Sequence, residues 1–217
     1  MLPFTRDQFV AIFAEYNEAV WPVQVVAYAL GFVMIVMLVG SSRLRDRTIA
    51  VGLAVMWLWT GIAYHALFFS AVNTAAFLFA ALFIIQGGLF AYFAVRGPLQ
   101  FGLRPGLTVW VGAAFALYAA VVYPLLGMWF GHPYPEMPMF GITPCPVTIL
   151  TFAFLLLTTG PVPLWLTVIP LTWSLIGGSA AFLLGVPQDW VLLATGVIAI
   201  PLIALHDRQG RHVVRVA

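Results

Sequence analysis

Seven stretches of mainly apolar residues follow one another along the chain, separated by short polar segments. They lie at about 21–40, 49–70, 74–95, 107–130, 144–160, 163–184 and 189–206. A helix that rises 1.5 Å per residue needs roughly 20 apolar residues to cross a hydrocarbon core about 30 Å thick. The pattern therefore predicts an all-α, polytopic membrane bundle of about seven transmembrane helices, with residues 1–217 forming a single transmembrane domain.

Two positions leave the number of spans open. The fifth stretch is short and begins at the proline pair Pro144 and Pro146. The connection between the second and third stretches, near Asn73, is also tight. A merged or re-entrant segment at that connection would reduce the count to six, and this alternative stays open.

The sequence before the first stretch predicts a short amphipathic helix over about residues 5–18. Thr5 and Gln8 have the spacing of a capping box. Apolar residues then recur at helical spacing: Phe9, Ile12, Phe13 and Tyr16. We expect this helix to lie on the outer membrane interface with its acidic face in water. The alternative is a simple extension of the next helix, bent at Pro22.

The charge content supports the membrane interpretation. Charged residues make up 7% of the chain and apolar residues 63%, whereas soluble domains contain about 25% charged residues. So few charges could not cover the surface of a soluble protein, so the expected partner is the lipid bilayer. The formal net charge of +2 is small, and nucleic acid is not an expected partner.

The basic residues predict the orientation. All nine are arginines, and a seven-span topology places eight of them on one side: Arg43, Arg45, Arg47, Arg96, Arg104, Arg208, Arg211 and Arg215. Only Arg6 falls on the other side. By the positive-inside rule, the N-terminus is then outside and residues 207–217 form a cytoplasmic tail.

A weak internal similarity suggests a repeat. Trp59-Thr60 in the second stretch parallels Trp173-Ser174 in the sixth, and each is followed by an apolar run and a polar turn. This pattern is compatible with a 3+1+3 parallel repeat, of the kind found in sugar-facilitator folds. Chance similarity within an apolar background is the competing explanation.

Several kinds of chemistry are disfavoured by the residues present. No Asp, Glu or Arg lies near the middle of a predicted span, which argues against a carboxylate-driven pump. The chain has no lysine, which excludes a retinal Schiff base. No nucleophile–base pattern is visible, so nothing in the sequence argues for an enzyme.

Neutral polar and aromatic side chains lie mostly toward the predicted outer leaflet. The candidate ligand-binding residues are Gln24, Tyr28, Trp57, Tyr64, His65, Gln86 and Tyr123. We interpret them as the lining of an outward-facing cavity. The alternative is that the polar members hydrogen-bond between helices and hold the bundle together.

The predicted proline-rich outer loop, residues 131–146, has an unusual composition. Together with a nearby helix it carries imidazole, thioether and thiol groups that suit a soft metal such as copper: His65, His132, Met137, Met139 and Cys145. Their spacing matches no established metal motif, and methionine also serves as apolar filler.

Three segments resemble a bacterial multi-pass membrane family classified as a domain of unknown function. They are WLWTGIAYH (Trp57–His65), MPMFGITPCPVTI (Met137–Ile149) and GSAAFLLGVPQDW (Gly178–Trp190). The resemblance covers nearly the whole chain. It implies a small protein of the bacterial inner (cytoplasmic) membrane and implies no activity.

Three functional hypotheses follow. The leading one is binding or facilitated transport of a small solute or soft metal ion through an outward-facing cavity. The second is an accessory or structural subunit of a larger membrane complex, and a homo-oligomer is the other assembly that the sequence allows. The third is a membrane redox protein that binds a metal or haem through His65, His132 and Cys145.

Overall fold

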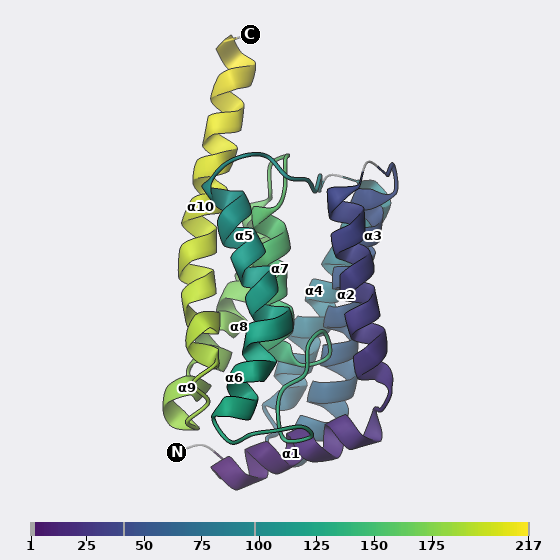
Figure 1. Ribbon diagram of the computed structural model, residues 1–217, viewed down its shortest axis with the longest axis vertical. Helices are drawn as coiled ribbons and strands as arrows, with labels where there is room; N and C mark the ends of the chain where they lie inside the picture. Colours follow the sequence, from purple (N-terminus) through teal and green to yellow (C-terminus); the bar gives the residue numbers. More distant parts are fainter. Residues whose placement is uncertain (1–2, 41, 98, 217) are drawn as a thin grey trace.

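The computed structural model describes residues 3–40, 42–97 and 99–216, with side chains as far as Asp207. Its elements are helical, apart from an isolated antiparallel bridge between Phe101 and Thr158 (Figure 1). The α-helices are α1 (Arg6–Ala19), α2 (Val23–Val39), α3 (Arg45–Trp59), α4 (Ala76–Arg96), α5 (Leu107–Leu117), α6 (Tyr123–Trp129), α7 (Pro144–Leu156), α8 (Val168–Gly178), α9 (Ala180–Leu183) and α10 (Asp189–Val216). The all-α class predicted from the sequence is confirmed.

Short irregular helices connect several of these elements. They are the π-helices η1 (Thr60–Phe68) and η3 (Tyr118–Val122) and the 3₁₀-helices η2 (Phe69–Ala71) and η4 (Leu164–Thr167). Each of the seven apolar stretches in the sequence contains helix. Within the described residues, five helical segments are long and apolar enough to cross a membrane: 45–71, 76–96, 107–129, 164–183 and 189–207. The count is six if α1 and α2, which meet at 83°, form one broken span.

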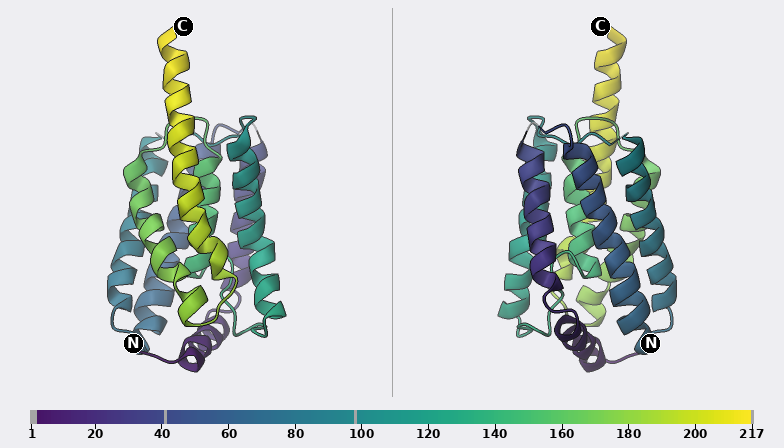
Figure 2. Two further views of the ribbon diagram at one scale, coloured as in Figure 1. Left: turned by 90° about the vertical axis from the view of Figure 1, so that its left-hand side faces the viewer. Right: turned by 90° about the vertical axis from the view of Figure 1, so that its right-hand side faces the viewer.

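Helix α1 lies across one end of the bundle, nearly perpendicular to the other helices (Figures 1 and 2). The predicted capping box at its start is confirmed, since the Thr5 side chain accepts from the Gln8 N–H and the Gln8 side chain accepts from the Thr5 N–H. The side of α1 that faces the bundle buries Ile12, Phe13 and Tyr16. Its amphipathic sequence thus forms a cover over the bundle end.

Helix α7 lies at the centre of the bundle, and all of its 13 residues are buried. Pro144 stands at its first turn, where a missing N–H leaves no hydrogen bond unmade. The preceding segment also enters the interior, because Phe140 and Ile142 are only 3% and 2% exposed. Much of the proline-rich segment is therefore packed inside the protein.

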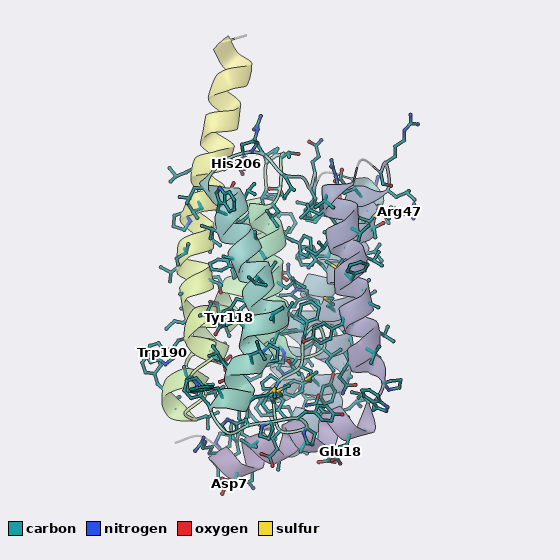
Figure 3. All side chains as sticks on the ribbon, in the orientation of Figure 1. Asp7, Glu18, Arg47, Tyr118, Trp190 and His206 are labelled. Carbon is teal, nitrogen blue, oxygen red and sulfur yellow. The ribbon has the colours of Figure 1, made fainter. Side chains whose placement is uncertain are left out.

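The two ends of the bundle differ in charge. Figure 3 shows Asp7 and Glu18 at the α1 end, and Arg47 and His206 at the opposite end. At that opposite end, Asp46 accepts a 2.8 Å hydrogen bond from the backbone N–H of Phe101. The two sets of charges are separated along the bundle as the arginine pattern predicts, while the side that faces the cytoplasm stays a prediction.

Two π-helical segments interrupt the long helices of the bundle. A π-turn interrupts the regular helix ladder and is frequent at functional sites. Segment η1 contains Tyr64 and His65, and η3 directly precedes Tyr123.

Gly61 lets η1 approach α4 closely, because a Cβ there would lie 3.1 Å from the carbonyl oxygen of Ala80.

Candidate functional site

A cavity of about 120 Å³ lies between α1 and the end of the bundle. Its walls are largely aromatic, with rings contributed by Phe4, Phe9, Phe13, Tyr64, Phe69, Phe79 and Trp173. Helices α7, α8, α9 and α10 supply most of the remainder, including Cys145 and Asp189, and Asn73 comes from the connection before α4. An apolar cavity of roughly 150 Å³ can hold a benzene-sized molecule. The space is therefore suited to a small solute.

Asp189 is the only charged side chain among the residues that line this cavity. It is 1% exposed, and its Oδ1 accepts a 2.6 Å hydrogen bond from the hydroxyl of Tyr123. The ion pairs found among the described side chains, Arg45–Asp46 and His206–Asp207, do not involve it. A buried carboxylate without a cation is costly, and such groups are often functional.

The turn over residues 185–188 positions Asp189 at the cavity. Gly185 has a φ of 64°, a left-handed conformation that favours glycine. The turn then closes with a 3.1 Å bond from the Asp189 N–H to the Val186 carbonyl. The Tyr118 hydroxyl fixes the turn from η3 by donating a 2.7 Å hydrogen bond to the Gln188 carbonyl. Figure 3 shows Tyr118 between the helix formed by α5 and α6 and helix α10.

Cys145, on the first turn of α7, lines the same cavity as Asp189, which begins α10. Trp173 also lines this cavity, and Cys145 is the single cysteine of the chain. The indole Nε1 of Trp173 is buried and, among the described residues, has no partner that meets full hydrogen-bond geometry. The carboxylate, the thiol and the indole thus share an aromatic-walled cavity, and the Tyr123 phenol bonds to the carboxylate.

His65 lies directly behind this wall. Its ring is fully buried, and neither ring nitrogen has a hydrogen-bond partner within the described part of the chain. Its centroid lies 4.7 Å from that of Phe83 and 5.0 Å from that of Trp173, in edge-to-face arrangements. His65 is not among the residues that line the cavity, so it contacts the site through the Trp173 ring.

The comparison with protein families matches residues 6–213 to a family of unknown function, DUF6064. The chain belongs to DUF6064. No curated protein and no solved structure matches this DUF6064 chain. The family assignment agrees with the resemblance in that both give a domain of unknown function, and it assigns no activity to the cavity.

The predicted ligand-binding residues separate into two groups in this DUF6064 protein. Tyr64 lines the cavity and Tyr123 bonds to its carboxylate, while His65 packs behind. The others hydrogen-bond elsewhere: Trp57 to Thr151, Gln24 to the Asn17 carbonyl, Tyr28 to the Ala120 carbonyl and Gln86 to the Leu166 carbonyl. The latter four match the alternative in which polar groups join helices.

The predicted soft-metal residues are dispersed. Nε2 of His132 lies 3.2 Å from Arg6, whereas Cys145 faces the cavity and His65 lies in its aromatic surroundings. Burial and the neighbouring Arg6 lower the pKa of His132, with Glu136 acting in the opposite direction. Met137 and Met139 are both in the segment that packs under α1, and the Met137 carbonyl accepts a bond from Asn17. In the described part of the chain, no three His, Cys, Asp or Glu side chains group around a metal position.

Sequence reasoning missed the two residues that define the polar end of the cavity, Asp189 and Trp173. Asp189 reads as an outer-loop residue, because it stands at the boundary between a polar turn and an apolar run. One signal could have identified Asp189 as a site residue. It lies in the Pro187-Gln188-Asp189 turn, within one of the three segments that carry the resemblance. Trp173 stands out in the sequence only through its place in the weak repeat.

Proposed function

We propose that this DUF6064 protein is an integral membrane protein that binds a small solute in the cavity beneath α1. The observation that carries the proposal is the buried Asp189 carboxylate at an aromatic-walled cavity, with no cationic side chain lining it. A pocket with mostly apolar walls and a few convergent polar groups is the usual form of a small-molecule site. Cys145 supplies a further polar group to the lining, and Tyr123 holds the carboxylate by its hydrogen bond.

The membrane part of the proposal rests on the outer surface of the bundle. Large apolar side chains are exposed there, including Trp110 at 76%, Phe32 at 69% and Leu67 at 68%. Lipid accommodates such side chains at no cost. We further propose seven spans with α7 as a short central one, the N-terminus outside, and location in the bacterial inner membrane. The 3+1+3 repeat remains part of this proposal.

Facilitated transport would extend binding by a second step. The cavity ends at the first turn of α7, and the buried remainder of α7 continues toward the arginine-rich end. Passage of a solute would therefore require a second arrangement of the helices around α7. A small organic solute suits the aromatic-walled site better than a soft metal, because no three His, Cys, Asp or Glu side chains group together among the described residues.

The single cysteine provides a direct test. Methyl methanethiosulfonate is small enough to enter the cavity, so we expect it to modify Cys145 in the purified, folded protein, as measured by intact mass. The substitution Ala180→Phe places a ring in the cavity lining and should slow modification at least about tenfold. Ala114→Phe, at an exposed position on α5, is the matched control and should leave the rate unchanged. An inert Cys145, or equal rates in both variants, would contradict the proposal.

A further inference from the structure

The charge and the wall chemistry of the cavity define a class of ligand. We propose that the solute is a small organic cation with a methylated or alkylated ammonium group. This inference rests on the proposed function and names the kind of solute that the same cavity takes.

The Asp189 carboxylate favours a cationic ligand. Asp189 lines the cavity, is almost fully buried and has no ionic partner among the described side chains. The hydrogen bond from Tyr123 satisfies one oxygen, Oδ1, and brings no positive charge to the carboxylate. A monovalent cation in the cavity would provide that compensation, which a neutral or anionic solute would not.

The aromatic walls of the cavity favour an alkylated ammonium group. Seven of the residues lining the cavity are Phe, Tyr or Trp. The negative faces of such rings attract ammonium groups, and aromatic cages recognise quaternary ammonium ligands in this way. Tyr64 stacks on Phe13 at 5.3 Å and on Phe69 at 5.7 Å, so rings from α1, η1 and η2 form one continuous wall.

The basic groups at this end leave the cavity free of positive charge. Arg6 is exposed, lies beside His132, and is not among the lining residues. His65 is separated from the cavity by Tyr64, Phe79 and Trp173, which line it. An alkylated ammonium group carries few or no N–H donors. The small number of acceptors in this cavity is therefore sufficient for it. The methyl groups would contact rings, and the charge would lie near Asp189.

The test uses three probes of similar size and different charge on the full-length protein at pH 8. They are tetramethylammonium, tert-butanol and trimethylacetate, at matched ionic strength. Each is measured by its ability to slow the modification of Cys145 by methyl methanethiosulfonate. We expect tetramethylammonium to protect at a concentration at least about tenfold below that of tert-butanol, and trimethylacetate not to protect.

The variant Asp189→Asn should remove the advantage of the cation over tert-butanol, whereas Asp7→Asn, at an exposed position on α1, should retain it. The comparison of probes on the unmodified protein needs no variant, so it stands if Asp189→Asn fails to fold. Equal protection by the three probes, protection by trimethylacetate alone, or an unchanged preference in Asp189→Asn would overturn the cation assignment and leave solute binding intact. A reactive Cys145 that no probe protects would also overturn it. A Cys145 that does not react at all would overturn the proposed function with it.

Discussion

The hydroxyl of Tyr123 and the carboxylate of Asp189 lie 2.6 Å apart, although 66 positions separate them in the chain. Tyr123 begins α6 directly after a π-helical turn, and Asp189 begins α10 directly after a glycine turn. This bond joins the two irregular segments at the α1 end. It is the contact through which the bundle holds its buried acid in place.

Tyr123→Phe removes this bond and keeps the ring. We expect the variant to lower the free energy of unfolding by about 1–3 kcal/mol, because a buried carboxylate oxygen loses its donor. The measurement is the midpoint of thermal unfolding in detergent. Tyr92→Phe is the matched control, since Tyr92 is 54% exposed and its hydroxyl makes no hydrogen bond to the described residues. Equal midpoints for the two variants would show that the Tyr123–Asp189 bond does not stabilise the fold.

The docking of α1 depends on Tyr16. Its hydroxyl accepts a 2.7 Å bond from the Trp59 indole and donates a 2.8 Å bond to the Ile142 carbonyl. Tyr16→Phe leaves both groups without a partner, so we expect faster hydrogen exchange throughout α1 and faster modification of Cys145. Tyr134→Phe serves as the control, because the hydroxyl of Tyr134 makes only a long 3.4 Å contact with the Asn17 carbonyl. Unchanged exchange in Tyr16→Phe would refute this role.

The contact between Arg6 and His132 predicts a dependence on pH. Burial and Arg6 lower the pKa of His132 below its ordinary value of 6.5. The folded protein therefore binds a proton at His132 less readily than the unfolded chain, and acid favours the unfolded chain. The stability linked to neutral His132 is complete above about pH 6.5 and declines as the pH falls below that value toward the depressed pKa.

Thermal unfolding measured between pH 8 and pH 5 tests this expectation. The midpoint of the natural protein should fall more steeply below pH 6.5 than that of His132→Gln, which has no group to titrate there. His206→Gln, at the opposite end of the bundle, controls for the loss of an imidazole. Parallel curves for the natural protein and His132→Gln would show that His132 does not control stability in this range.

Close packing between α3 and α4 depends on a glycine pair. A Cβ at Gly87 would lie 2.6 Å from Cγ and 3.0 Å from the backbone nitrogen of Leu58, whereas a Cβ at Gly88 would meet nothing within 4 Å. Gly87→Leu should therefore cost about 1–3 kcal/mol or more through overpacking. Gly88→Leu, one residue away, should be tolerated. The difference between their unfolding midpoints in detergent measures the effect, and equal midpoints would contradict the close approach of α3 and α4 at Gly87.

The fold was largely predictable, because the apolar segments and the caps are local signals. The helix over 5–18 was predictable from Thr5, Gln8 and the apolar spacing, and the observed α1 spans Arg6–Ala19. The π-helical geometry of η1 was not predictable, because the sequence WLWTGIAYH has the pattern of an ordinary α-helix. Its wide turns arise where η1 packs on α4, α1 and α8, which are tertiary contacts without a local signature.

The site was predictable only in part. Tyr64, a candidate ligand-binding residue, and Cys145, a candidate metal ligand, both line the cavity. Gln24 and Gln86 are also polar residues within predicted spans, but their side chains bond to backbone carbonyls and do not line the cavity. Asp189 could not be distinguished from a solvated loop acid, because its burial depends on Tyr118, Tyr123 and α1, all distant in sequence.

Sided labelling of Cys145 tests the central claim most directly, namely that a solute reaches the cavity from the α1 side. The protein is placed in sealed vesicles of known orientation and treated with a small, membrane-impermeant methanethiosulfonate carrying a trimethylammonium group. Reference cysteines at Asp7 and Arg47, each introduced in a Cys145→Ala background, report the two bundle ends. We predict that Cys145 is labelled from the side that labels the Asp7 position and not from the side that labels the Arg47 position. Labelling from the Arg47 side, or from neither side, would contradict the account.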